Sequence, residues 1–499
     1  MSSTGHDYVI IGSGAGGGTL AYALTKKGKK VLLIERGHYL PREKENWQAR
    51  AVFLENRYHT KENWYDKDGK AFLPGMNYYV GGNTKVYGAA LLRLRKEDFG
   101  EIKHFGGISP AWPLYYEDFQ PYYLKAEELY TVHGERGEDP TEPPENAPFP
   151  YPAISHEPYI QKIADQFKAK NLHPFHLPLG LRLNEKDPEN SPCIRCDTCD
   201  GFPCLVHAKS DAHISCIIPA LATGNLTLMT DAKALRLIAE GKTIKEVEVV
   251  QNGKTERISG KTFIVSCGAI NSAALLLRSS VANSSDLVGR NYMFHQNSVM
   301  IAISKERNPT RYEKTMAVND FYFNAPDSPF PLGHIQLLGN VKGEMLAEEA
   351  PSFAPELSLD FIADHSVGWW LTSEDLPDPN NRITLNAKGE IVLSYTNNNE
   401  EAHKRLLAKL KDLLSGSHTH FFPNKMYLSQ RIPIAGCAHQ VGTCRFGKDP
   451  KTSVLDLNCK AHDLDNLYVV DSSFFPSIGA VNPTLTIIAN ALRVADLID

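Results

Sequence analysis

The hydrophobic pattern at the start of the chain predicts a strand, a helix and a second strand in close succession. Residues 8–11 are uniformly apolar and rich in β-branched side chains, which is typical of a strand buried in a parallel sheet. A helical pattern follows over residues 19–27 and ends at Gly28. Residues 30–35 form another apolar run that closes with an acid, so this region predicts a strand–helix–strand unit.

Short apolar runs in the middle of the chain predict further strands. Residues 225–230 and 261–266 each have the length and composition of one strand. Between them, residues 234–238 and 246–251 alternate apolar with polar positions, which indicates an antiparallel meander.

The pattern changes again in the second half of the chain. Residues 382–385 and 391–395 predict a hairpin, and residues 400–414 have the apolar spacing of an amphipathic helix. We interpret its apolar side as core packing; it carries Leu406, Leu407, Leu410, Leu413 and Leu414. Residues 138–152, by contrast, are rich in proline and acids and predict an irregular loop.

Composition and charge exclude several classes of function. Hydrophobic residues make up 42% and charged residues 22% of the 499 positions, as in an ordinary globular protein. A net charge of -5 provides no basic field for nucleic acid or an anionic membrane. Since no secretion signal and no membrane-spanning run is apparent, we expect a soluble, cytoplasmic protein; its oligomeric state is open.

The turn after the first predicted strand has the composition of a dinucleotide-binding loop. Gly12-Ser13-Gly14-Ala15-Gly16-Gly17 fits the G-x-G-x-x-G spacing, in which glycines let the backbone approach a pyrophosphate at a helix N-terminus. Glu35 ends the second strand, where a carboxylate can accept hydrogen bonds from ribose hydroxyls. These features predict dinucleotide binding but do not separate FAD from NAD.

Further motifs resemble those of one enzyme family. They are residues 81–90, 111–119, 266–272, 437–447 and 479–486. The first of them follows residues 78–80, a run that predicts a short strand. In this order they resemble the glucose–methanol–choline (GMC) flavoprotein oxidoreductases, and most of all the pyranose oxidases and related sugar dehydrogenases. The resemblance implies FAD as cofactor and an α/β fold, α+β overall.

The resemblance also implies a division of the chain into two domains, which its length allows. A discontinuous Rossmann-like FAD-binding domain would comprise residues 1–95, 205–295 and 430–499. A substrate-binding domain, built on a mostly antiparallel sheet covered by helices, would comprise residues 96–204 and 296–429. A cysteine-rich loop at 193–204 would belong to the second domain.

The predicted cofactor contacts come from several motifs. They are Gly12, Ser13, Gly14, Ala15, Gly16, Gly17, Glu35, Arg36, Gly81, Gly82, Asn83, Thr84, Ala232, Asp471, Asn482 and Thr484. Some pyranose oxidases bind FAD covalently through a histidine of the second glycine motif, where this chain has Val86. Because valine cannot form that bond, we expect noncovalent FAD.

His439 and Asn482 are the predicted catalytic pair. An imidazole can accept a hydroxyl proton near neutral pH, and an amide can orient the hydroxyl without competing for that proton. By resemblance His439 would lie beside flavin N5, the hydride acceptor. A buried structural histidine and an asparagine that caps the helix predicted from residue 484 are the alternative interpretations.

Four closely spaced cysteines allow more than one interpretation. Cys193, Cys196, Cys199 and Cys204 could hold zinc or an iron–sulfur cluster, although their spacing matches neither common ferredoxin pattern. A disulfide, or a loop whose thiols pack as small apolar groups, is equally compatible with the sequence.

The sequence therefore predicts FAD-dependent oxidation of a primary or secondary hydroxyl of a sugar or glycoside. Oxygen or another electron acceptor would reoxidise the flavin. Two alternatives stay open: a redox flavoprotein centred on a cysteine-ligated iron–sulfur cluster, and an NAD-dependent dehydrogenase. Trp369, Trp370 and Tyr395 could stack on a sugar, although strand or core packing accounts for them better.

Overall fold

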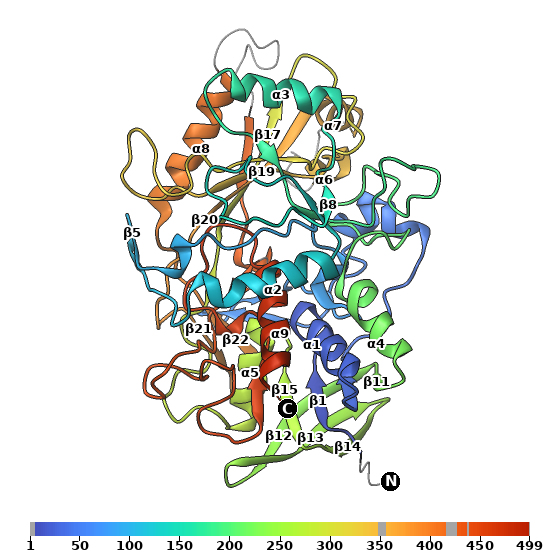
Figure 1. The fold of residues 1–499 in the computed structure, drawn as a ribbon, viewed down its shortest axis with the longest axis vertical. Helices are drawn as coiled ribbons and strands as arrows, with labels where there is room; N and C mark the ends of the chain where they lie inside the picture. The colour runs from blue at the N-terminus through green and yellow to red at the C-terminus, as the bar shows by residue number, and fades with distance from the viewer. Residues whose placement is uncertain (1–4, 348–355, 416–426, 437–438, 499) are drawn as a thin grey trace.

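The structure, a computed structural model, describes residues 5–347, 356–415, 427–436 and 439–498. Its long axis runs from a parallel sheet at one end to an antiparallel sheet at the other, and each sheet has its own hydrophobic core (Figure 1). The mixed α/β fold class is therefore confirmed. No helix among the described residues is long and apolar enough to cross a membrane.

The parallel sheet is assembled from three distant stretches of chain. It has the order β11-β2-β1-β15-β25, with β1 (Tyr8–Ile11), β2 (Val31–Ile34), β11 (Leu226–Met229), β15 (Thr262–Val265) and β25 (Leu467–Val469). Every neighbouring pair is parallel. Both central strands, β1 and β2, are buried throughout, which explains why they are continuous apolar runs.

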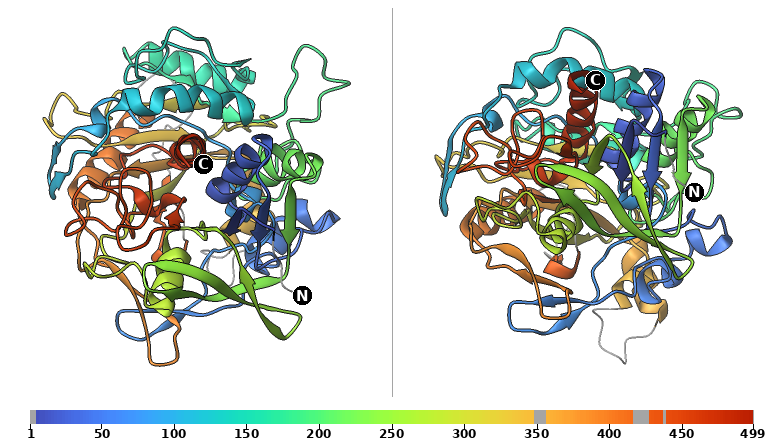
Figure 2. Two further views of the ribbon diagram at one scale, coloured as in Figure 1. Left: turned by 60° about the horizontal axis from the view of Figure 1, so that its bottom comes forward. Right: turned by 90° about the horizontal axis from the view of Figure 1, so that it is seen from below.

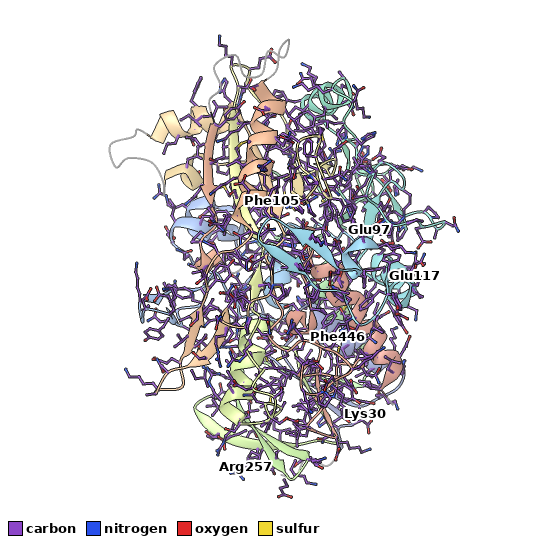
Figure 3. All side chains as sticks on the ribbon, turned by 90° about the vertical axis from the view of Figure 1, so that its left-hand side faces the viewer. Lys30, Glu97, Phe105, Glu117, Arg257 and Phe446 are labelled. Carbon is purple, nitrogen blue, oxygen red and sulfur yellow. The ribbon has the colours of Figure 1, made fainter. Side chains whose placement is uncertain are left out.

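Helices cover this sheet and connect its strands. They include α1 (Ala15–Lys26), α2 (Tyr116–Leu129), α5 (Ala269–Ser279) and α9 (Thr484–Leu497). The C-terminal helix α9 lies beside both α1 and α2, so the two ends of the chain pack together (Figures 1 and 2). The predicted meander is confirmed as β12 (Ala232–Glu240), β13 (Thr243–Gln251) and β14 (Lys254–Ser259). Arg257 marks its position at the lower end of the molecule in Figure 3.

The second sheet is six-stranded and antiparallel. Its order is β23-β17-β20-β19-β18-β9, with β9 (Phe175–His176), β17 (Gln296–Ile303), β18 (Met316–Val318), β19 (His334–Leu337), β20 (Ser366–Ser373) and β23 (Tyr427–Arg431). Helices α3 (Pro158–Lys168) and α8 (Glu400–Ser415) pack on it and share its hydrophobic core. The leucine stripe of α8 is confirmed as core packing, because Leu406, Leu410 and Leu414 are buried there.

The predicted hairpin forms as β21 (Arg382–Leu385) and β22 (Ile391–Ser394), and β22 also pairs with a strand from the N-terminal region. That strand, β3 (Trp64–Asp66), and its neighbour β4 (Ala71–Phe72) complete a four-stranded sheet. The strand predicted at residues 78–80 does not form. In the described structure, this run makes only an isolated bridge between His38 and Tyr79. Gly37 lies close against this run, since a Cβ there would be 1.8 Å from the Tyr78 carbonyl oxygen, and the Val80 amide donates to the His38 carbonyl.

Short elements complete the fold. They are β5 (Ile102–His104), β6 (Gly107–Ser109), β7 (Val132–Gly134), β8 (Tyr151–Pro152), β10 (Leu179–Gly180), β16 (Met293–Phe294), β24 (Gln440–Val441), α4 (Ile218–Ala222), α6 (Gly343–Ala347) and α7 (Glu356–Asp364). The proline-rich residues 138–152 form a loop as predicted, apart from β8 at its end.

Candidate functional site

A cavity of about 880 Å³ lies between the two sheets. Its wall contains the residues that follow the carboxyl ends of four parallel strands, namely Gly12, Glu35, Ser266 and Asp471. The opposite wall contains residues of the antiparallel sheet, including Gln336 and Trp370. Ligands of open α/β sheets bind outside the carboxyl ends of the strands, which makes this cavity the candidate site.

Two glycines of the turn, Gly12 and Gly16, have no space for a side chain. Gly12 has φ +102°, and a Cβ there would lie 2.2 Å from the Ser266 carbonyl oxygen. A Cβ at Gly16 would lie 2.0 Å from the Val470 carbonyl oxygen, while one at Gly14 would meet no atom of the described residues within 4 Å. Gly14 therefore borders open cavity, and its neighbours shape the turn that exposes it.

Ser13 connects the first glycine motif with the second. Its amide and its hydroxyl both donate to one carboxylate oxygen of Glu35, at 3.1 and 2.5 Å. The Gly81 amide in turn donates to the Ser13 hydroxyl oxygen at 3.0 Å. Burial raises the pKa of Glu35, whose other oxygen accepts from the Gly37 amide. Glu35 thus borders the cavity with three protein hydrogen bonds already made.

Arg36 lies on the same wall, but it is engaged with protein groups. Its guanidinium pairs with Glu62 at 3.1 Å and stacks 3.7 Å from the centre of the Tyr78 ring. Arg36 and Lys233 together hold the pKa of the partly buried Glu62 at about 2 against the opposing effect of burial. Ala232 also borders the cavity, and its amide donates to the Glu35 carbonyl.

The second glycine motif forms a short 3-10 helix, Gly82–Lys85. Its start requires positive φ at Gly81 and Gly82, +99° and +57°. The Thr84 hydroxyl donates to the Gly81 carbonyl and accepts from the Ala212 amide, which fixes the turn. Gly82, Asn83 and Thr84 line the cavity together with Val86, whereas Gly81 and Gly17 stand behind its wall.

Asp471 follows β25 and is a cap as well as a cavity residue. It accepts hydrogen bonds from the Ser473 amide, the Ser272 hydroxyl and the Gly268 amide, and burial raises its pKa. Thr484 begins α9 and lines the cavity too. Asn482 makes no side-chain cap on this helix, so the capping interpretation is wrong.

His439 and Asn482 meet in the cavity although 43 positions separate them. The Asn482 amide nitrogen lies 3.2 Å from His439 Nε2. Desolvation lowers the pKa of His439 to about 3, with smaller contributions from the charges of Lys314 and His334. His439 is therefore neutral near pH 7 and its lone pair is available. Cys437 and Ala438, the start of this motif, lie outside the described residues.

Several groups in the cavity wall or directly behind it were not predicted from the sequence. Lys314 and Asp200 form an ion pair beside Gly88, and the Trp370 ring lies edge-on to His439 with centroids 6.3 Å apart. Trp370 borders the cavity, whereas its neighbour Trp369 is core. His295 contacts His439 directly, with 2.9 Å between the two Nδ1 atoms. Alternation along residues 366–373 could have indicated opposite faces for Trp369 and Trp370; nothing local identifies the other groups.

The four clustered cysteines are free thiols and line no part of the cavity. Among the described residues, no group of three or more His, Cys, Asp or Glu side chains is arranged to hold a metal ion. Burial raises the pKa of Cys193 to about 11 and that of Cys199 to about 12, whereas metal ligation requires thiolates. The structure thus supports neither the zinc and iron–sulfur alternatives nor the disulfide.

Comparison with known proteins identifies the family. Sequence models of the GMC oxidoreductase N- and C-terminal domains match residues 6–297 and 377–491. The chain belongs to the GMC oxidoreductase family. GMC oxidoreductases are FAD-dependent enzymes, so the NAD-dependent alternative is not supported. Phe446, labelled in Figure 3, belongs to the motif that resembled this family and packs edge-on against Trp112.

Relatives of this GMC oxidoreductase are named as oxidases or dehydrogenases of several different compounds. It is 30% identical to a 6'''-hydroxyparomomycin C oxidase of Streptomyces lividus, over 98% of this chain and 90% of the relative. A paromamine 6'-oxidase of Streptomyces fradiae gives the same identity and coverage, and a fructose dehydrogenase large subunit of Gluconobacter japonicus is 25% identical over 99% and 97%. The fold matches pyridoxine 4-oxidase from Mesorbium loti with a TM-score of 0.68, at 18% identity over 99% of both chains.

The cavity of this GMC oxidoreductase fits FAD. Gly14 provides backbone without a side chain where the pyrophosphate is expected, and Glu35 lies at the end of the neighbouring strand. The N-terminus of α9 reaches the wall at Thr484, where its positive end suits the electron-rich part of a flavin ring. His439 and Asn482 share this cavity with the glycine turn, so a hydroxyl substrate and the cofactor would meet there.

Proposed function

We propose that this GMC oxidoreductase oxidises a hydroxyl group of a sugar or glycoside to a carbonyl, with His439 as the base. The observation that carries the proposal is the pair of His439 Nε2 and the Asn482 amide, 3.2 Å apart in the cavity that contains the glycine turn. FAD, when bound, accepts a hydride at N5. Relatives named for paromamine, a hydroxyparomomycin and fructose support polyhydroxylated substrates.

The two catalytic groups divide the work at the substrate hydroxyl. His439 Nε2 accepts the hydroxyl proton, and the Asn482 amide donates to the hydroxyl oxygen and orients it. Burial keeps His439 neutral before the reaction, which is the form that can accept a proton. Loss of the proton to His439 leaves the oxygen electrons that form the carbonyl, while the hydride of the neighbouring carbon would pass to the FAD held in the same cavity.

The wall opposite the glycine turn suits a ring that bears several hydroxyl groups. The Lys314–Asp200 ion pair supplies donors and acceptors, Gln336 supplies an amide, and Trp370 supplies an aromatic surface. Since each of these groups lines the cavity that holds His439, substrate hydroxyls other than the reacting one would bind here. We expect this wall to favour sugars over simple alcohols.

We also propose noncovalent FAD, because Val86 offers no nucleophile at the wall of the cavity. The predicted division into a cofactor domain (1–95, 205–295, 430–499) and a substrate domain (96–204, 296–429) is proposed as well. The two sheets with separate cores support it. Both oxidases and dehydrogenases occur among the relatives, so oxygen or another acceptor would reoxidise the enzyme.

An anaerobic screen of sugars, glycosides and simple alcohols for bleaching of the flavin absorption tests the proposal. We expect a polyol to reduce the flavin, and His439→Ala to keep FAD while losing about a hundredfold or more in reduction rate. His173→Ala is the matched control, because His173 is exposed and pairs with Asp320 outside the cavity. An FAD-loaded protein that no hydroxyl compound reduces, or an unimpaired His439→Ala, would contradict it.

A further inference from the structure

A row of hydrogen bonds runs from a backbone carbonyl through two histidines to Asn482. His295 Nε2 lies 2.9 Å from the Gly479 carbonyl oxygen, and His295 Nδ1 lies 2.9 Å from His439 Nδ1. His439 Nε2 then faces the Asn482 amide nitrogen at 3.2 Å. Each ring nitrogen in the row has one partner, so the position of every proton can be worked out.

The carbonyl at one end decides the direction of the whole row. A carbonyl oxygen only accepts, so His295 Nε2 must carry a hydrogen. His295 is fully buried and neutral, since desolvation holds its pKa well below the usual value, and its Nδ1 is therefore an acceptor. His439 must then donate from Nδ1, and because it is neutral too, its Nε2 carries the lone pair.

The Gly479 carbonyl at the end of this row is itself held in place. The Gly479 amide donates to Glu374 at 3.2 Å, and Glu374 also accepts from the Ser109 hydroxyl and pairs with His104. Gly479 has φ +63°, and a Cβ there would lie 2.9 Å from Leu94. All these groups are buried, so the carbonyl that orients His295 cannot turn away without breaking a buried polar network.

We propose that His295 is a positioning residue that keeps His439 in the tautomer with hydrogen on Nδ1 and the basic lone pair on Nε2. The inference rests on the proposed function, because it concerns the base of that reaction. Without an acceptor at His295 Nδ1, His439 would exchange freely between tautomers, and the form with hydrogen on Nε2 cannot accept the substrate proton. His295 does not carry the proton onward, since its own Nε2–H ends at a carbonyl.

Two substitutions separate positioning from packing. His295→Leu removes the acceptor, whereas His295→Gln can offer an amide oxygen to His439 Nδ1–H and an amide N–H to Gly479. His403→Leu is the matched control, because His403 is another buried histidine, and among the described residues it bonds Ser298 and Ser373 rather than His439. Each FAD-loaded variant is reduced anaerobically with the sugar that best reduces the wild type, and the limiting rate and the apparent Kd are separated.

We expect His295→Leu to lower the limiting rate by about a hundredfold or more with little change in Kd, because a correctly protonated general base contributes at least that much. His295→Gln should recover most of the rate, and His403→Leu should remain near wild type. A fast His295→Leu, an effect confined to Kd, or a slow His295→Gln would overturn the proposal. A normal His439→Ala would instead overturn the proposed function.

A measurement on the wild type avoids any failure of a variant to fold. In protein labelled with ¹⁵N-histidine, the ring nitrogen shifts report which nitrogen carries hydrogen. The His439 signals are assigned by their loss in His439→Gln. Hydrogen on His439 Nδ1 supports the proposal, and hydrogen on Nε2 refutes it.

Discussion

Substitution of Gly14 by alanine, which adds a single methyl group, should weaken cofactor binding without weakening the fold. A Cβ at Gly14 would meet nothing within 4 Å in the part of the chain that the structure describes, and the backbone there has φ -69°, which alanine adopts without strain. Gly14→Ala should therefore leave the apoprotein as stable as the wild type, or more stable by about 0.4–1 kcal/mol through the unfolded state. The methyl group would project into the cavity where the pyrophosphate is expected.

The expected loss of FAD affinity follows from crowding at that contact. Forcing one methyl group into a packed contact costs about 1–3 kcal/mol. Because about 1.4 kcal/mol is a factor of ten, the Kd for FAD should rise roughly 5- to 150-fold. Gly16→Ala should behave differently, since its Cβ would lie 2.0 Å from the Val470 carbonyl oxygen and 2.9 Å from the Ser266 hydroxyl. It should weaken the fold and FAD binding together.

Two assays on the apoproteins give the answer. Urea unfolding measures stability, and titration with FAD, followed by flavin fluorescence, measures Kd. Gly5→Ala is the matched control, because a Cβ there also meets nothing within 4 Å but Gly5 lies outside the cavity wall. A wild-type Kd for Gly14→Ala would show that the pyrophosphate does not approach this glycine, and a destabilised Gly14→Ala apoprotein would show that the turn is misplaced.

Three other changes have defined outcomes. Lys85→Met should destabilise the protein by about 3–5 kcal/mol in urea unfolding, because it leaves Asp211 buried without the cation that lies 2.8 Å from it. The double variant Lys85→Met with Asp211→Asn should recover most of that loss. Burial lowers the pKa of His403 to about 3, and the charge of Arg431 adds to this effect. Because an unfolded histidine takes up its proton near pH 6.5, the stability that neutral His403 contributes is complete above about pH 6.5 and is lost as the pH falls toward 3. The stability advantage of the wild type over His403→Gln should thus shrink by about 2 kcal/mol between pH 7 and pH 5, and a constant difference would rule the shift out. Acid precipitation should release all the FAD into the supernatant, since Val86 cannot bond to it; flavin retained in the pellet would mean that another residue forms a covalent link.

Much of this fold could be predicted from local patterns, because such patterns depend only on neighbouring residues. The apolar run at 8–11, the glycine turn after it and the acid at residue 35 specify a strand–turn–helix unit within one short stretch. The alternation in the meander and the leucine stripe of α8 were equally local, and both are confirmed. The strand expected at 78–80 is wrong, because in the described structure this run makes only an isolated bridge to His38, a contact that its local pattern does not record.

The site itself depends on contacts that no local pattern records. His295 meets His439 across 144 positions, and Asp200 pairs with Lys314 across 114. Proximity in sequence did not decide between the alternatives for the four cysteines, which lie close together along the chain but form no metal-binding group among the described residues. The sequence by itself therefore determined the glycine turn and predicted His439 and Asn482 as the catalytic pair. Only the packing of two sheets against one cavity decided which distant side chains contact His439 and which line the opposite wall, because those contacts join segments far apart in the chain.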